Sequence, residues 1–135
     1  MKYLTLIFIF MFLGCKTLTI SKANKQLFKP GIPNAKEYLN YSFIVSSKSN
    51  FKDDNISIEN FPKELKYFYK NQNTGETSYK MLKPFIKGNY EFKFKLLNVD
   101  NISKNENLVF EYTINHKKKK QIIAIKTKFE TVYLK

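Results

Sequence analysis

Large apolar side chains recur at every second position through most of the chain beyond residue 38, and this alternation restricts the fold more than any other feature. In residues 90–96, Tyr, Phe, Phe and Leu alternate with Glu, Lys and Lys, and residues 108–114 repeat the pattern. Successive side chains of a β-strand point to opposite faces, so this period indicates strands with one face in the core and one in water. No stretch has the spacing of an amphipathic helix, and the sequence therefore predicts an all-β fold.

The alternating segments are short, and polar turns separate them. In the last segment Phe129 and Tyr133 are in phase with Ile125, but other apolar residues are out of phase, which predicts burial on both faces or a β-bulge. The expected strands are residues 39–46, 56–58, 65–70, 77–82, 90–96, 108–114 and 121–134. This pattern favours an antiparallel β-sandwich of about seven strands, which we expect to occupy residues 39–135.

One short motif bears on the topology. Gly88-Asn89-Tyr90-Glu91-Phe92 resembles the tyrosine corner of immunoglobulin-like domains, in which a tyrosine at a strand start hydrogen-bonds back to the preceding backbone. The resemblance implies such a bond from the Tyr90 hydroxyl. The cysteine pair and buried tryptophan of that family are absent, so an immunoglobulin-like topology is one option among several sandwiches.

The first fifteen residues have the parts of a secretory signal: Lys2 supplies positive charge, residues 3–13 are uncharged and mostly apolar, and Gly14 precedes Cys15. The apolar run is shorter than the about 20 residues that a transmembrane helix needs. Phe12-Leu13-Gly14-Cys15 resembles the lipobox of bacterial lipoproteins, with Phe12 departing from the usual pattern. The resemblance implies cleavage of residues 1–14, a thioether-linked diacylglycerol on Cys15 and acylation of the new amino terminus. The alternatives are an ordinary signal peptide with a coincidental cysteine, or a cysteine thiol in the core.

Residues 15–38 are expected to be the lipidated cysteine followed by a flexible polar tether. This segment is rich in lysine and contains, late in its length, Pro30-Gly31, a pair that suits a type II turn. Its lysines are either those of a solvated spacer or contacts to an anionic surface.

The charge balance points to anionic partners. The net charge is +13, and all 24 basic residues are lysines. Candidate partners are anionic lipid or other anionic envelope polymer and an acidic protein, unless the lysines form only a solvated surface. Nucleic acid is not expected as a partner, because an exported protein is separated from most of it and because base recognition relies mainly on arginine, which this chain lacks. With the only cysteine lipidated, neither a disulfide nor a thiolate ligand remains.

The densest charge is the run Lys117, Lys118, Lys119 and Lys120, hereafter the lysine cluster, which follows His116. We expect it at a hairpin tip, either as a polyanion contact made of point charges or as a solvated loop that discourages edge pairing. His116 is the only histidine and lacks recognisable partners for a triad or a zinc site. It is therefore expected to be exposed.

Two further groups are ambiguous. Asp53-Asp54-Asn55 offers oxygens to calcium but lacks the glycine and terminal glutamate of a calcium loop, so an ordinary turn is expected. Tyr67-Phe68-Tyr69 places at least one ring outward, to stack on a sugar or a partner or to be buried on a second face. No catalytic residues, metal ligands or cofactor motifs are predicted.

These features together predict a small lipoprotein that is not an enzyme and acts as an envelope binding or structural module. Retention of some lipoproteins at the inner membrane resembles a rule that requires Asp directly after the lipidated cysteine, but Lys16 follows Cys15. We therefore expect the outer membrane, facing the periplasm; surface display stays open. The alternative function is an immunity-type or inhibitor protein that neutralises an envelope toxin or hydrolase.

Overall fold

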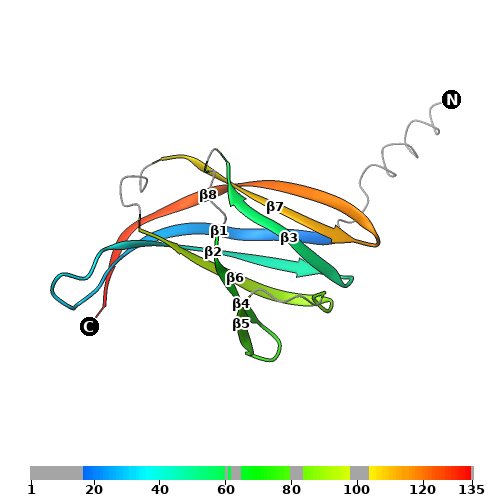
Figure 1. The fold of residues 1–135 in the computed structure, drawn as a ribbon, viewed down its shortest axis with the longest axis horizontal. Coiled ribbons are helices and arrows are strands. Elements are labelled where there is room, and N and C mark those ends of the chain that lie inside the picture. The colour runs from blue at the N-terminus through cyan, green and yellow to red at the C-terminus, as the bar shows by residue number, and fades with distance from the viewer. Residues whose placement is uncertain (1–16, 60, 62–64, 80–83, 98–103, 135) are drawn as a thin grey trace, which may run out of the picture.

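The computed structural model describes residues 17–59, 61, 65–79, 84–97 and 104–134 (Figure 1). The expected signal peptide and Cys15 lie outside the described residues. Eight strands make up the described fold: β1 (Leu18–Lys29), β2 (Tyr38–Ser47), β3 (Phe51–Ile58), β4 (Tyr67–Asn71), β5 (Thr77–Tyr79), β6 (Gly88–Leu96), β7 (Glu106–Ile114) and β8 (Lys117–Tyr133).

The strands form one sheet in the order β3-β7-β8-β1-β2-β6-β4-β5. Every pairing is antiparallel except that of β1 with β8, which is parallel. The 17-residue β8 joins the two halves of the sheet: its first half pairs with β7 and its second half with β1. Figure 1 shows the long strands following one curved surface.

The sheet curls so that its two ends meet across an aromatic core. Phe110 of β7 packs edge-on against Phe43 of β2 and Phe92 of β6, with ring centroids 6.0 and 5.9 Å apart. Phe51 of β3 and Phe85 exchange two backbone hydrogen bonds, at 3.0 and 2.6 Å, and their rings stack. The predicted all-β, sandwich-like class is therefore confirmed, with its core between the two halves of one sheet.

Three of the expected strands match the alternation closely. The apolar positions of residues 39–45, 90–94 and 108–114 are buried, whereas the positions between them are at least partly exposed. The Tyr90 hydroxyl donates to the Ile86 carbonyl oxygen at 2.7 Å, which is the bond that the tyrosine-corner resemblance implied. The pairing of β8 with β1 is irregular between Lys128 and Val132, which agrees with the predicted bulge.

The prediction of a flexible tether over residues 15–38 is wrong for residues 18–29. These residues form β1, which lies between β2 and β8 in the middle of the sheet. A bulge between Ser21 and Asn24, with Lys22 at a φ of 52°, shifts which side chains face the core. The β domain therefore begins at Leu18 or earlier and not at residue 39.

A buried ion pair explains how a polar segment becomes a central strand. The Lys25 side chain is fully buried; its amine pairs with the Glu106 carboxylate and donates to the Lys104 carbonyl oxygen at 2.8 Å. The Tyr41 hydroxyl donates to the same carboxylate at 2.8 Å. Burial, with the hydrogen bond to Glu106 and its charge, raises the pKa of Tyr41. Because buried charges need partners, the contacts of Lys25 with Glu106 and Lys104 help β1 to accommodate its charge.

Candidate polyanion-binding surface

The lysine cluster lies on the first residues of β8 and not in the loop that was predicted for it. Asn115 and His116 alone make the turn from β7 to β8, and both adopt left-handed backbone conformations, with φ of 51° and 63°. Two left-handed central residues are typical of a type I′ turn, whose twist matches that of the strands it joins. His116 is exposed at this tip, as predicted.

The pairing of β8 with β7 distributes the lysine cluster over both faces of the sheet. Lys118 and Lys120 lie opposite Thr113 and Glu111, and paired residues project to the same face. Lys117 and Lys119 lie opposite Ile114 and Tyr112, whose side chains are buried. All four lysines are nevertheless exposed, so the cluster presents amines on both faces at one end of the sheet.

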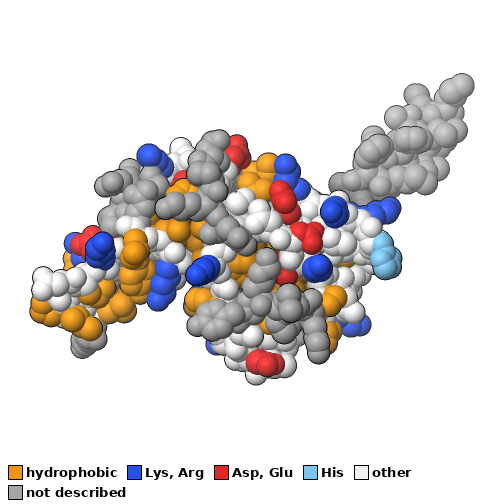
Figure 2. Space-filling view, in the orientation of Figure 1, with side chains coloured by type: hydrophobic (Ala, Val, Ile, Leu, Met, Phe, Trp, Pro, Cys, Tyr) orange, Lys and Arg blue, Asp and Glu red, His pale blue; other side chains and the backbone are white. Residues whose placement is uncertain are grey.

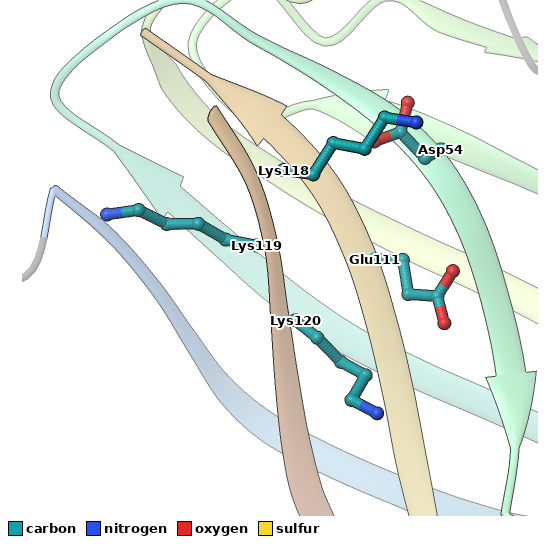
Figure 3. A pocket seen from close by; sticks show the side chains of 5 residues that line it. All are labelled: Asp54, Glu111, Lys118, Lys119 and Lys120. Carbon is teal, nitrogen blue, oxygen red and sulfur yellow. The ribbon is translucent and has the colours of Figure 1, made fainter. Parts of the chain in front are cut away.

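Lys118, Lys119 and Lys120 line an open groove of about 350 Å³ together with Asp54 and Glu111. Of these three lysines, Lys118 and Lys120 project to the outer face. Figure 3 shows the Lys118 amine pointing toward the Asp54 carboxylate, while Lys119 points away from it. The groove holds three cationic and two anionic side chains. It is therefore net basic, with carboxylates beside the lysines.

A bulge in β3 places Asp54 at this groove. The register of β3 against β7 shifts between Asp53 and Asn55, so Asp53 is buried while Asp54 accepts a hydrogen bond from the Thr113 hydroxyl at 2.6 Å. The turn expected at residues 53–55 is therefore wrong, because these residues belong to β3. In the part of the chain that the structure describes, no group of three or more His, Cys, Asp or Glu side chains can hold a metal ion.

A second hollow, of about 390 Å³, lies between the beginnings of β8 and β1. It is lined by Thr17, Leu18, Tyr112, Ile114, Lys119, Lys120 and Gln121. The hollow forms because β1 pairs with β8 only from Asn24 onward. The Gln121 amide spans the separation by donating to the Leu18 carbonyl oxygen and to the Tyr112 hydroxyl, both at 2.9 Å. The lysine cluster therefore borders the point where the described chain enters the sheet.

The aromatic run on β4 is mostly core. Tyr67 and Tyr69 are buried, and Phe68 occupies the outward position with partial exposure. The expectation of at least one outward ring is thus met by Phe68.

Sequence reasoning misplaced two residues of β8. Phe129 and Tyr133, expected in phase with the core, are 76 and 72% exposed. Both lie in the last part of β8, at the end of the sheet opposite the lysine cluster. Ile32, in the connection from β1 to β2, lies at the same end and is 72% exposed. Phe129 is flanked by the charged residues Lys128 and Glu130. Charged residues are rarely buried, so their presence is the sequence feature that indicates a solvent-exposed segment here.

Comparison with protein-family models, with curated proteins and with solved structures gives no significant match to this chain. Among the described residues there is no helix with the length and apolar character needed to cross a membrane.

Proposed function

We propose that this chain is a small non-catalytic lipoprotein of the bacterial envelope, anchored through acylated Cys15. Its β domain binds an anionic partner, which is anionic lipid, another anionic envelope polymer or an acidic protein. The proposed location is the outer membrane, facing the periplasm. The anchor is supported by the apolar run and by Gly14 before the only cysteine.

The observation that carries the binding role is the exposed lysine cluster at one end of the sheet, on both of its faces. A lysine amine acts as a point charge on a flexible stem and attracts anions without fixing their orientation. Catalysis instead requires reacting groups to be held in one geometry. The groove is open, and the described residues that line it are all charged, which suits attraction of a polyanion better than chemistry on a substrate.

The anchor is tested by metabolic labelling and fractionation. Wild-type protein grown with radiolabelled palmitate should carry label and sediment with membranes, and the Cys15→Ala variant should lose both properties. A matched Ser49→Ala variant, altered in the turn between β2 and β3, controls for substitution as such. Wild-type protein that sediments without ever incorporating label would refute lipid anchoring.

A second candidate function, an immunity-type protein or inhibitor, is supported by the exposed apolar side chains of Ile32, Phe129 and Tyr133 at the opposite end. Exposed aromatic residues of this kind often anchor protein interfaces. Crosslinking in intact cells should then capture one stoichiometric acidic enzyme, and Phe129→Ser should abolish the capture. Capture that persists in this variant would count against an inhibitor that acts through this end.

A further inference from the structure

The folded body begins almost immediately after Cys15. The Thr17 carbonyl oxygen accepts a hydrogen bond from the Lys48 amide at 2.9 Å, and Leu18 is buried. Only Lys16 separates Thr17 from Cys15. Two residues of extended chain span about 7 Å, so a lipid on Cys15 holds the domain close to the membrane surface.

The lysine cluster lies at this same end. Lys119 and Lys120 line one hollow with Thr17 and Leu18, and the next residue of β8 bonds to the Leu18 carbonyl oxygen. A strand rises about 3.3 Å per residue, so the cluster extends roughly 13 Å beyond that bond. The Debye length at physiological salt is about 8 Å, so Lys119 and Lys120 lie within one Debye length of that bond, and Lys117 and Lys118 lie beyond it.

Two further lysines belong to this end. β2 ends at Ser47, which pairs with Gly88 at the start of β6; Lys48 and Lys87 adjoin these residues and are exposed. Figure 2 shows lysine side chains at this end of the molecule, with a few acidic side chains between them. We call Lys48, Lys87 and the lysine cluster the basic end; the nearby carboxylates of Asp54 and Glu111 offset part of its charge.

We infer that the basic end docks on anionic phospholipid headgroups of the membrane that holds Cys15. The inference rests on the proposed acylation, because the short link makes the contact intramolecular and raises the effective concentration of headgroups. Lysines close to an anionic membrane surface are attracted by its negative potential. Headgroup phosphates are mobile, so point charges suffice to bind them. Docking directs Ile32, Phe129 and Tyr133 away from the membrane.

The orientation is tested with the full-length protein, extracted in detergent and added to preformed vesicles of phosphatidylcholine alone or with added phosphatidylglycerol. Cys15 is the only native cysteine, so His116→Cys and Ile32→Cys each introduce one reactive thiol once Cys15 is acylated. With a membrane-impermeant maleimide, labelling at position 116 should slow severalfold on phosphatidylglycerol vesicles relative to phosphatidylcholine. High salt should restore the faster rate, and labelling at position 32 should be equal on both.

Matched variants assign the effect to the lysines. Glutamine at all four positions of the lysine cluster should abolish the slowing at position 116. Glutamine at Lys126 and Lys128, which are exposed farther along β8, should preserve it. Circular dichroism and the thermal midpoint of each variant verify folding, and slowing that survives in the folded quadruple variant would overturn the inference.

Failure of the anchor and failure of docking give different results. Protein that does not float with phosphatidylcholine vesicles lacks the lipid, which contradicts the proposed function itself. Protein that floats with both vesicle types but is labelled equally fast at position 116 on both is anchored without docking, and this outcome overturns only the inference.

Discussion

Lys25 and Glu106 form a buried ion pair that joins the central strand β1 to the start of β7, across β8, which lies between them. The Lys25 side chain is fully buried and that of Glu106 is 10% exposed. Tyr41 of β2 donates to the same carboxylate, so three strands meet at one oxygen. The pair lies beside the middle of β8, where Glu106 pairs with Ile125 and Lys25 with Thr127.

Replacing Lys25 with methionine should destabilise the protein strongly, because the Glu106 charge would stay largely buried without its cation. Loss of one partner of a buried pair costs about 3–5 kcal/mol. The matched control is Lys93→Met, which removes a partner of Glu91 from a pair at 3.0 Å with both side chains more than a quarter exposed. Such surface pairs contribute about 0–1 kcal/mol. Urea unfolding measures both, and equal losses would contradict a structural role for the buried pair.

Stability should fall at alkaline pH in a manner that depends on Tyr41. Its folded-state pKa is raised by burial and by Glu106, whereas the unfolded value is about 10. The folded state therefore keeps a proton that the unfolded chain releases, and this contribution is complete below about pH 10 and declines above it. We expect the free energy of unfolding of wild type to decrease by up to about 1.4 kcal/mol per pH unit more steeply than that of Tyr41→Phe.

The comparison is made by urea unfolding between about pH 9 and pH 11, on either side of the ordinary tyrosine pKa. Tyr90, whose pKa burial and the nearby Tyr69 also raise, is present in both proteins, so some slope should remain in Tyr41→Phe. Identical slopes for the two proteins would show that Tyr41 is not held protonated by folding.

The aromatic core predicts a sharp contrast between two phenylalanines. Phe92 is fully buried and packs against Phe43 and Phe110, so Phe92→Ala should cost about 3–5 kcal/mol. Phe129 is 76% exposed, and Phe129→Ala should change stability by no more than about 0.5 kcal/mol. Thermal unfolding of the two variants side by side measures the difference, and a large loss in Phe129→Ala would place its ring in a core.

The β7–β8 turn predicts a stabilising substitution. His116 has a φ of 63°, a region in which a side chain costs roughly 1–2 kcal/mol and glycine costs little. His116→Gly creates the Asn-Gly sequence favoured in type I′ turns and should stabilise the protein by about 1 kcal/mol. His116→Ala keeps the strain and serves as the control, since it should give no such gain; chemical denaturation compares them.

The strands that were predicted correctly are those whose alternation is uninterrupted. Residues 90–96 and 108–114 carry apolar side chains at each inward position, so the period alone identifies them. β1 was missed because the bulge at Lys22 changes the phase and because Lys25 occupies a core position. The partner that makes that burial favourable, Glu106, is 81 residues away, and no local pattern reveals it.

The residues of the candidate site were predicted from the sequence, but their position at the start of a strand and their nearness to Thr17 were not. The lysine cluster was assigned to a loop because runs of lysine are uncommon in strands, but the two-residue turn leaves these residues in β8. Their nearness to Thr17 follows from the parallel pairing of β1 with β8. That pairing depends on long-range contacts across the sheet, which the sequence pattern does not encode.

The proposed placement of the basic end depends on β1 being a strand, because a flexible tether would separate the domain from its anchor. Hydrogen–deuterium exchange of the membrane-extracted full-length protein measures this directly. We expect the amides of Asn24, Lys25, Gln26 and Phe28, which pair with both β2 and β8, to exchange as slowly as those of β2. Exchange in residues 18–29 as fast as in the exposed connection at residues 31–36 would contradict the central strand and the close attachment that follows from it.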